Sequence, residues 1–344
     1  MQMKDITIYG CFEGEGGQRQ TVDITDIVTA LTIQTSLDAQ PGQLDATLVV
    51  DGYRDEGEIS LGAGIRVVNG NTEVFSGFVF SVSQTRAKTV QIVAYDVLRY
   101  LKNQSTYVFS KETLDQIFKK VCEQCGIEAG TVDSSSKEQP ARAADVQSGF
   151  DVIEEAIGYA LAFEKKYYVL QAEGTKLALR DIENLKTDIL IDEENGEIDF
   201  QHTASIDQDT YNKVVVAVEV KDAKSKGKSS EKSWSKPIEK EDTQTQKSWG
   251  LLQYTHIFND SVSYDMAERA AENLLAMTNR IYQTLQVTCQ GNWEVKAGTG
   301  LHIRFNRFKS FDNGQGYYVK TCTHTVTNAQ HKMVLELHVH NVVD

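Results

Sequence analysis

Two stretches of this chain, far apart in the sequence, share one order of glycine turns and alternating strands. Each begins with a turn that contains two glycines, continues as a short strand, and is followed by a glycine-aromatic strand and a closing alternating strand. The segments are Gly62–Val67, Gly77–Phe80 and Thr89–Val93 in the first stretch, and Gly298–Ile303, Gly316–Val319 and Lys332–Leu337 in the second. This order is typical of a small antiparallel β module. The repetition predicts that the chain contains one β-barrel twice.

The charge balance limits the partners that the surface can bind. The chain has 49 acidic and 35 basic residues, so its net charge is −14, and such a surface repels phosphate backbones. We therefore expect no specific binding of nucleic acid. An acidic wall does suit a passage through which nucleic acid slides without sticking.

The sequence carries no targeting signal that we recognise. No window approaches the roughly 18 apolar residues of a membrane helix, and the start of the chain turns at once into strand-like alternation rather than a signal-peptide core. The five cysteines have no framework spacing, which suits free thiols in a reducing compartment. We expect a protein without a membrane segment that is made in the cytoplasm.

The apolar pattern changes period along the 344 residues and predicts three domains. Residues 1–105 alternate as strands and form the first barrel module. Residues 106–200 contain two stretches with helical spacing followed by two strands, which indicates an intervening α+β domain. Ser110 is the expected cap and Gly126 the expected end of the first helix, and Ser148 is the expected cap of the second. The predicted fold class is β-rich α+β.

The remaining residues, 201–344, are predicted to form the second barrel module. A strand is expected at Lys213–Val220, followed by a polar loop over 221–247 that is rich in Lys, Ser, Glu and Thr. A long helix is expected over 263–282, where apolar residues recur along one stripe.

Two groups of residues have a spacing that is compatible with metal or redox chemistry. Two residues separate Cys122 from Cys125, but the pair falls in the last turn of a predicted helix, whereas redox pairs use a helix start. Glu336, His338 and His340 share one face of a strand, which suits a metal site or simply a polar surface. We favour packing and a polar face, and we predict no cofactor and no metal.

Other acidic and glycine-rich segments do not match the context of a catalytic site. Gly14–Gly17 lacks the Lys and Ser/Thr of a phosphate loop and reads as a hairpin turn. Glu154, Glu155 and the acidic run Asp192–Glu194 offer carboxylates, but on a helix face and in a turn rather than across a sugar-binding cleft. We therefore assign no catalytic residue.

Large apolar side chains follow the polar loop directly. They are Trp249, Leu251, Leu252 and Tyr254. They fit either a core strand or a contact between subunits, where aromatic anchors are favoured. We take these four residues as candidate assembly contacts.

Several motifs, in their order and spacing, resemble a known family. They are Pro41–Asp45, Tyr95–Leu98, Lys247–Tyr254, the alanine-rich helix from Ala267 to Leu275, Gly291–Gly298, and Gly316–Val319 leading to His324 and His331–Met333. Over most of its length the chain resembles the phage tail baseplate hub or late control D proteins, in particular the XkdQ-like group of contractile phage tails and phage-tail-like bacteriocins.

The resemblance implies a homotrimeric hub that joins a six-fold tail tube to a three-fold central spike and forms part of the central channel. Each subunit would carry two tube-like barrels and an intervening domain. The implied partners are copies of the chain itself, the tail tube protein, the spike protein and other baseplate proteins, with non-specific passage of DNA through the channel. The protein would be assembled in the cytoplasm of the producing bacterium and then reside in the tail baseplate of a phage or bacteriocin particle.

The resemblance favours a structural protein rather than an enzyme. Some related hubs carry a fused wall-degrading domain, and we expect none here because the last predicted strand ends close to Asp344. Two alternatives remain open. One is a peptidoglycan-degrading tail enzyme, and the other is a receptor- or carbohydrate-binding tail protein that uses tyrosines such as Tyr167, Tyr168, Tyr317 and Tyr318.

Overall fold

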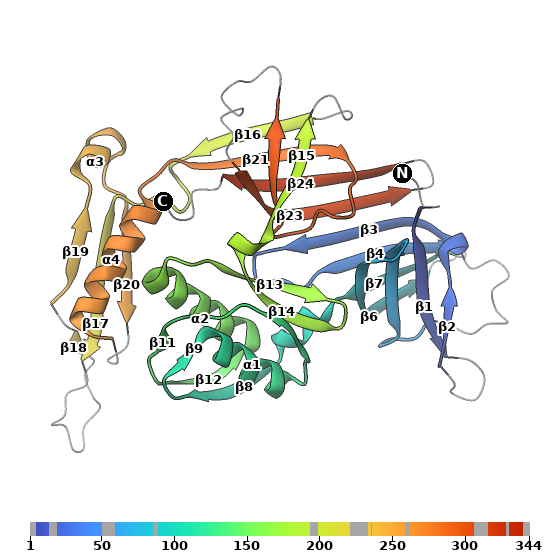
Figure 1. Ribbon diagram of the computed structural model, residues 1–344, viewed down its shortest axis with the longest axis horizontal. Coiled ribbons are helices and arrows are strands. Elements are labelled where there is room, and N and C mark those ends of the chain that lie inside the picture. The colour runs from blue at the N-terminus through green and yellow to red at the C-terminus, as the bar shows by residue number, and fades with distance from the viewer. Residues whose placement is uncertain are drawn as a thin grey trace.

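The computed structural model shows four groups of elements (Figure 1). They are a first module, a last module, an insert and a small α/β unit. Strands of the two ends of the chain share one large sheet, an α+β insert lies beneath it, and a small α/β unit lies at one end. The structure describes residues 5–13, 19–49, 59–84, 89–192, 199–220, 233–234, 236–258, 262–305, 316–327 and 330–339.

The described part of the first module consists of antiparallel strands with short 3-10 helices between them. Its strands form because small and branched apolar residues alternate with polar ones, as in β4, where Leu44, Ala46 and Leu48 are buried and the residues between them are not. The elements are β1 (Thr7–Glu13), β2 (Arg19–Asp23), η2 (Thr25–Ile27), β3 (Val28–Ser36), β4 (Gln43–Val49), β5 (Gly64–Asn69), β6 (Thr72–Gln84), β7 (Thr89–Tyr95) and η4 (Val97–Lys102).

The last module, as far as the structure describes it, has six strands and its own apolar core around Val287, Val319 and Leu335. Its strands are β15 (Lys186–Asp192), β16 (Asp199–Ser205), β21 (Tyr282–Gln290), β22 (Gly300–Arg304), β23 (Gly316–Thr327) and β24 (His331–Val339). The repetition seen in the sequence is confirmed in the strand pairing, because β22, β23 and β24 form the same antiparallel meander as β5, β6 and β7.

The two meanders agree in their hydrogen bonds. In the first, Gly62 N donates to Val79 O at 2.7 Å, and Val79 N donates to Ala63 O at 2.9 Å. In the last, Gly298 N donates to Val319 O at 2.8 Å, and Val319 N donates to Thr299 O at 3.0 Å. Val79 is therefore equivalent to Val319.

This equivalence shows that one detail of the match between the two stretches, as made from the sequence, was wrong. The motifs suggest that Gly77 matches Gly316, but the strand registers match Gly77 with Tyr317, one residue further on. The physical reason is that a Cβ at Gly77 would lie 2.4 Å from the carbonyl oxygen of Tyr95, so glycine is required there for local packing and does not mark a shared turn. A bulge interrupts both meanders one residue after the equivalent valines, at Phe80 and at Lys320.

The described strands of both modules form one open sheet of 13 strands, and no closed barrel occurs among them. The β-rich α+β class is confirmed, but the arrangement as two barrels is not. The modules also differ at one side, because β5 pairs with an antiparallel neighbour, β1, whereas β22 pairs with a parallel one, β15. The predicted domain limits stay predictions. β15, which lies before residue 201, and β16, which spans that residue, both pair with strands of the last module.

The insert packs two helices against short strands, with Phe118, Ile153 and Leu177 among its buried residues. Its elements are β8 (Gln104–Phe109), β9 (Glu112–Thr113), α1 (Leu114–Cys125), β10 (Ala129–Val132), β11 (Glu138–Gln139), β12 (Arg142–Ser148), α2 (Gly149–Glu164), β13 (Tyr168–Glu173), β14 (Lys176–Asp181) and the 3-10 helix η5 (Ile182–Leu185).

The predicted helix ends are confirmed at two of three positions. Ser148 caps α2 by accepting a hydrogen bond from Asp151 N, and Gly126 ends α1 at φ +69°. The expected cap at Ser110 was wrong, because α1 begins four residues later behind Thr113, whose capping box with Gln116 satisfies the first amides.

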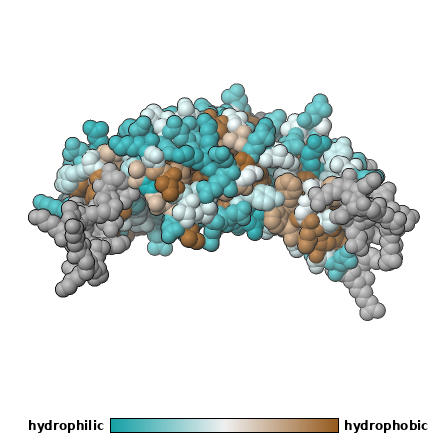
Figure 2. Space-filling model, turned by 90° about the horizontal axis from the view of Figure 1, so that it is seen from below, coloured by the Kyte–Doolittle hydropathy of each residue, from teal (hydrophilic) through white to brown (hydrophobic). Residues whose placement is uncertain are grey.

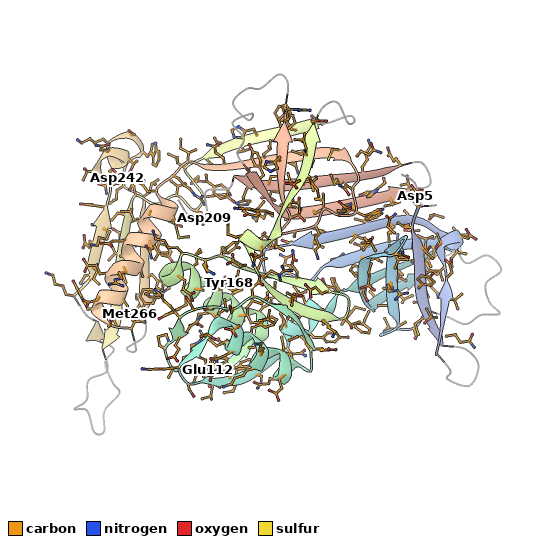
Figure 3. All side chains as sticks on the ribbon, viewed as in Figure 1. Asp5, Glu112, Tyr168, Asp209, Asp242 and Met266 are labelled. Atoms are coloured by element: carbon orange, nitrogen blue, oxygen red, sulfur yellow. The ribbon has the colours of Figure 1, made fainter. Side chains whose placement is uncertain are left out.

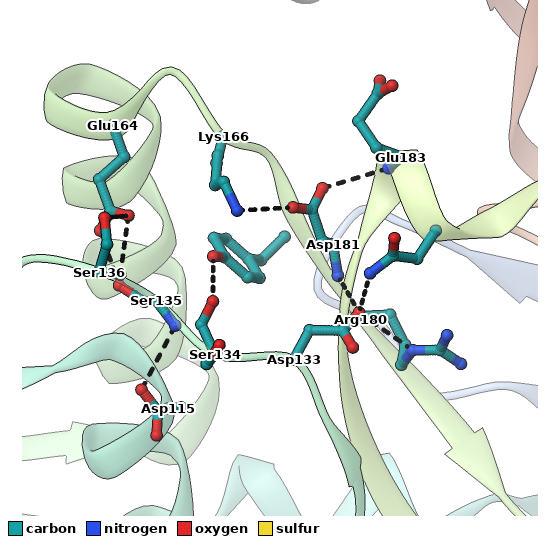
Figure 4. A network of polar contacts seen from close by, with 12 residues as sticks. Asp115, Asp133, Ser134, Ser135, Ser136, Glu164, Lys166, Arg180, Asp181 and Glu183 are labelled. Atoms are coloured by element: carbon teal, nitrogen blue, oxygen red, sulfur yellow. Dashed lines mark hydrogen bonds and ion pairs between the residues drawn. The ribbon is translucent and has the colours of Figure 1, made fainter.

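A polar network fixes the segment that joins β10 to β11 (Figure 4). Asp133 accepts hydrogen bonds from Asp181 N, Arg180 Nε and Asn184 Nδ2 at 2.7, 3.2 and 3.1 Å. These donors hold the pKa of Asp133 below its usual value although burial opposes them. Glu164, at the end of α2, binds Ser135 and Ser136 in the same way, so the loop is tied to both neighbouring elements.

A small α/β unit lies between β16 and β21 in the chain and forms one end of the molecule, where Figure 3 labels Asp242 and Met266. Its elements are β17 (Lys213–Val220), β18 (Ser233–Trp234), β19 (Ile238–Glu241), α3 (Thr243–Trp249), β20 (Gln253–Phe258) and α4 (Tyr264–Thr278). The strand at Lys213–Val220 is confirmed. Part of the predicted loop 221–247 was wrong, because β19 and α3 occupy its second half and Asp242 caps α3. The long helix ends at Thr278, earlier than the expected residue 282.

On the face seen from below, most of the coloured surface is hydrophilic and the apolar side chains gather in small groups (Figure 2). Among the helices of the described residues, none is long and apolar enough to cross a membrane. All five cysteines are free thiols, and three of them are buried.

Candidate assembly surface

The two modules are joined within the chain by pairing of β23 with β3, which we call the internal seam. Seven residue pairs, from Thr321–Ser36 to Thr327–Ala30, define it. Its core side is largely buried, with exposed fractions of 3% for Ile33 and 1% for Val326. Beyond the strands, Leu37 N donates to Lys320 O at 2.9 Å, and Ala297 N donates to Thr35 Oγ1 at 2.9 Å. The internal seam therefore holds the modules in a fixed relation.

A buried aromatic and histidine cluster lies directly under the internal seam. His324 Nδ1 lies 3.0 Å from His331 Nε2, and the ring of Trp293 stacks on His331 at 3.9 Å. Burial lowers the pKa of both histidines, to about 4 for His331, where the neighbouring His324 adds to the effect. Both rings are therefore neutral at neutral pH, and the cluster is a packed polar core.

A second buried titratable group, Asp96, lies at the end of β7. Its carboxylate accepts hydrogen bonds from Gly42 N at 2.9 Å and Leu98 N at 3.0 Å, and burial raises its pKa to about 7. It lines a cleft of about 280 Å³ between the first module, the insert and the last module, together with Lys296. Its bonds go to backbone amides, so Asp96 holds the turn after Pro41.

The face of the sheet that points away from the core is rich in neutral polar side chains. On the internal seam this face carries Thr32 and Gln34 opposite Thr325 and Thr323, and the same chemistry continues across the neighbouring strands. Further hydroxyl and amide residues on it are Gln43, Thr47, Gln91, Gln201, Thr203, Thr284, Gln286, Thr288, Gln290, Thr321 and Thr327. The same face also carries the charged residues Asp45, Asp199, Glu336 and Lys332, so its charges are mostly acidic and it has few cations to bind a phosphate backbone.

The strand registers also identify the strand of the last module that corresponds to β3. β16 pairs with β21 as β3 pairs with β4, which makes Phe200 equivalent to Leu31 and His202 equivalent to Ile33. Among the described strands, β16 pairs with β21 alone and ends the sheet. Sequence reasoning missed this strand, because its exposed residues show no apolar alternation. No local spacing could have revealed it, because its partner strand β21 begins only at Tyr282, after the whole small α/β unit.

The predicted assembly contacts all lie in the small α/β unit and differ in exposure. Leu251 is 61% exposed in the turn after α3. Leu252 is partly buried, and its backbone amide donates to Asn212 Oδ1 at 2.9 Å. Tyr254 packs against the core of the unit, with its ring 5.2 Å from that of Tyr211, and Trp249 is partly buried at the end of α3. Leu251 is the member of the set that is most available to a partner.

The other chemical candidates are placed as packing and surface residues. Cys122 is buried in the insert core, and burial raises its pKa to about 12, which disfavours a thiolate. Glu336 lies 3.5 Å from Lys320, and His338 bonds the hydroxyl of Tyr282. His340 and Gly14–Gly17 lie outside the described residues. Within the described part of the chain, no group of three or more His, Cys, Asp or Glu side chains is placed to hold a metal ion.

The fold is that of phage tail proteins. The 43 kDa tail protein of prophage MuSo2 from Shewanella oneidensis matches with a TM-score of 0.70 at 13% identity, covering 98% of this chain and 100% of that one. An Escherichia coli component of the type VI secretion system, described as similar to the T4 tail proteins gp27 and gp5, matches with a TM-score of 0.58 at 8% identity, covering 92% and 74%.

Sequence comparison places the chain within a particular family. It belongs to the YQBQ-like family, whose model matches residues 31–338. The phage-like element PBSX protein XkdQ of Bacillus subtilis is 25% identical over 307 residues, which cover 86% of this chain and 88% of that protein. The resemblance to the tail baseplate family is thereby confirmed.

Proposed function

We propose that this protein is a structural hub of a contractile tail baseplate, a trimeric symmetry adaptor that joins the six-fold tail tube to the three-fold central spike. The observation that carries the proposal is the repeated meander with its shared bulge. Two equivalent modules per chain, in three copies, offer six equivalent strand units to the tube while the whole ring keeps three-fold symmetry. Each module would complete a barrel-like unit only within this ring.

The neutral polar face of the sheet supports the second part of the proposal, a central channel. Hydroxyl and amide groups stay hydrated and do not retain phosphates, so DNA or another cargo passes such a wall without specific binding. The membership in a family with a phage-element relative supports residence in a tail particle after assembly in the producing cell.

The function would reside in interfaces, and we propose no catalytic role. Three buried titratable groups could be considered for catalysis. Asp96 is hydrogen-bonded to the backbone, and His324 and His331 are bonded to each other. We propose Leu251, with Trp249, Leu252 and Tyr254 behind it, as a contact with another baseplate protein. This contact would lie apart from the internal seam, at the end of the molecule.

The test combines particle imaging with the mass of the native protein. Deletion of the gene from the producing strain should abolish complete tails, and the purified protein should have three times the mass of the 38.4 kDa chain when it is co-expressed with its spike. Intact tails that fail to adsorb would instead identify a receptor-binding protein. Soluble muropeptides released from purified cell wall would identify an enzyme.

A further inference from the structure

The sheet contains one four-strand unit twice, and the two ends of this repeat are complementary. Its order is β16, β21, β24, β23 and then β3, β4, β7, β6, with every neighbouring pair antiparallel. The internal seam joins the last strand of one unit, β23, to the first strand of the other, β3. The remaining last strand is β6, and the remaining first strand is β16.

The end segment of β6 has the same local structure as the part of β23 that forms the internal seam. Both follow the bulge at Phe80 or Lys320, and both pair with the closing strand of their meander on one edge. On its other edge, β23 pairs with β3 from Thr321 onward. The equivalent segment of β6, Ser81–Gln84, pairs with β7 alone among the described strands.

We propose that Ser81–Gln84 of one copy pairs with β16 of a second copy, in the antiparallel arrangement that β23 and β3 adopt inside each chain. This inference rests on the proposed ring of three copies and specifies the contact that closes it. The partner is a second copy of this chain, because the internal seam already demonstrates that the two strand types fit each other. Repetition of the same contact around the ring leaves neither strand type at an edge.

We call the proposed pairing of Ser81–Gln84 with β16 of a second copy the external seam. Its register follows from that of the internal seam. Ser81 is equivalent to Thr321 and Ser205 to Ser36, so the pair Thr321–Ser36 becomes Ser81–Ser205. The next pairs are Val82–Ala204, Ser83–Thr203 and Gln84–His202. The bond from Leu37 N to Lys320 O identifies Thr321–Ser36 as a non-hydrogen-bonded pair, and therefore Ser83 and Thr203 also face each other without exchanging backbone bonds.

The side chains fit a seam that forms late and between separate molecules. On the outer face, serine and threonine hydroxyls oppose one another, which continues the neutral polar face across the contact. On the core face, Gln84 and His202 replace the buried pair His324 and Ile33 of the internal seam. Polar residues at these places keep the strands soluble before assembly, whereas a hydrophobic edge would aggregate.

A shift of one residue would destroy this fit. It would place outer-face residues of one copy opposite core-face residues of the other, for example Ser83 opposite Ala204, because β21 fixes the faces of β16 and side chains alternate along a strand. The proposal thus commits to one register, and pairs of introduced cysteines can distinguish this register from shifted ones.

The experiment uses disulfide formation in the full-length protein, purified with its spike or within tails. Cα atoms of non-hydrogen-bonded antiparallel pairs lie about 4.5 Å apart, within the range that a disulfide bridges. The variant Ser83→Cys with Thr203→Cys should give covalent multimers on mild oxidation, in at least tenfold greater yield than either single variant. Gln34→Cys with Thr323→Cys, a pair in the internal seam, should cross-link within one chain and serves as the positive control. Ser83→Cys with Gln201→Cys, two residues out of register, should not cross-link.

The outcomes separate this contact from the proposed hub. A particle of three times the chain mass in which only the internal pair cross-links would overturn the external seam and leave the trimer intact. A cross-link from Ser83→Cys to a different tail protein would show that another occupant covers β6. A protein absent from tails would instead overturn the hub itself.

A measurement on the unaltered protein covers the case in which the cysteine variants fail to fold. Hydrogen exchange should slow at the amides of Val82 and Ala204 by at least tenfold between the free chain and the assembled particle, because both amides face the external seam. Unchanged exchange at both amides in an assembled particle would overturn the pairing.

Discussion

β3 and β16 occupy the same position in the two modules, yet their sequences differ in one respect. β3 has a strand on each edge and carries Leu31 and Ile33 toward the core, with exposed fractions of 1% and 3%. β16 has one strand neighbour within the described chain and carries Phe200 and His202 at the equivalent positions, where His202 is exposed. The residues that a strand carries toward the core therefore depend on how many strands flank it within one chain, as well as on its position in the module.

The largest expected effect is a difference in stability when the equivalent side chains of β3 and β16 are each replaced by alanine. Ile33→Ala should reduce the free energy of unfolding by about 2–5 kcal/mol, since it leaves a cavity in a closed core. The matched change His202→Ala should cost the isolated chain less than about 0.5 kcal/mol, because the side chain is exposed. Urea denaturation of both variants measures the difference. Equal losses would mean that β16 is already covered in the free protein.

The next effect is a contrast in pH dependence, because the first module buries an acid and the last module buries two bases. The folded pKa of Asp96 is raised to about 7 by burial, so the folded chain retains a proton there and this group destabilises the fold as the pH rises from about 4 to 7. The folded pKa of His331 is lowered to about 4, so the unfolded chain takes up the proton first and stability is lost as the pH falls from about 6.5 to 4. The two slopes oppose each other in the natural protein.

Single substitutions should reveal each slope, with changes on the order of 1–3 kcal/mol over the window. Asp96→Asn resembles the protonated acid and removes its titration, so the variant should become more stable as the pH rises from 4 to 6.5. His331→Gln should show the reverse trend. Urea midpoints at pH 4, 5.5 and 7 decide this, and identical profiles for the two variants would contradict the assignment.

Two equivalent glycines provide a smaller and more local contrast. Gly62 and Gly298 both adopt positive φ, at +78° and +90°, so alanine at either position is strained by about 1–2 kcal/mol. At Gly62 nothing lies within 4 Å of an added Cβ, whereas at Gly298 it would lie 2.6 Å from Gln171 Nε2. That amide donates to Ala297 O at 2.7 Å, and its loss should add about 1 kcal/mol. Thermal unfolding of Gly62→Ala and Gly298→Ala measures the gap, and equal costs would show that Gln171 moves aside freely.

Features that a few neighbouring residues determine were predictable from the sequence. The turn glycines, the cap at Ser148 and the end of α1 at Gly126 depend on backbone angles and on hydrogen bonds that span three or four residues. The repeated meander was equally visible, because alternation and glycine spacing are local. Its bulges were not, since Phe80 and Lys320 have nothing in common as residues and only their strand partners define them.

Features that depend on distant contacts were missed. β19 reads as polar loop because Ile238 is its one buried residue, and it becomes a strand through pairing with β17. The first turn of α3 is likewise stabilised by Asp242, which accepts hydrogen bonds from Gln244 N and Thr245 N. β16 was missed for a related reason, because its polar residues are those of an edge and not those of a core strand. Among the candidate contacts, the sequence could not separate exposed Leu251 from Tyr254, whose ring packs on Tyr211 across the unit.

The smallest effect on stability is expected at Leu251, the exposed member of the candidate contacts. Leu251→Asp should change the free energy of unfolding by less than about 0.5 kcal/mol, because its side chain is 61% exposed. It should nevertheless reduce the yield of complete tails, since an apolar contact cannot accommodate an unpaired carboxylate. Leu61→Asp is the matched control, because Leu61 is 65% exposed in the turn before Gly62. Electron microscopy of tails from the two strains makes the comparison. Normal tails from Leu251→Asp would remove this turn from the assembly surface, and the two edge strands would then be the better supported contacts of the chain.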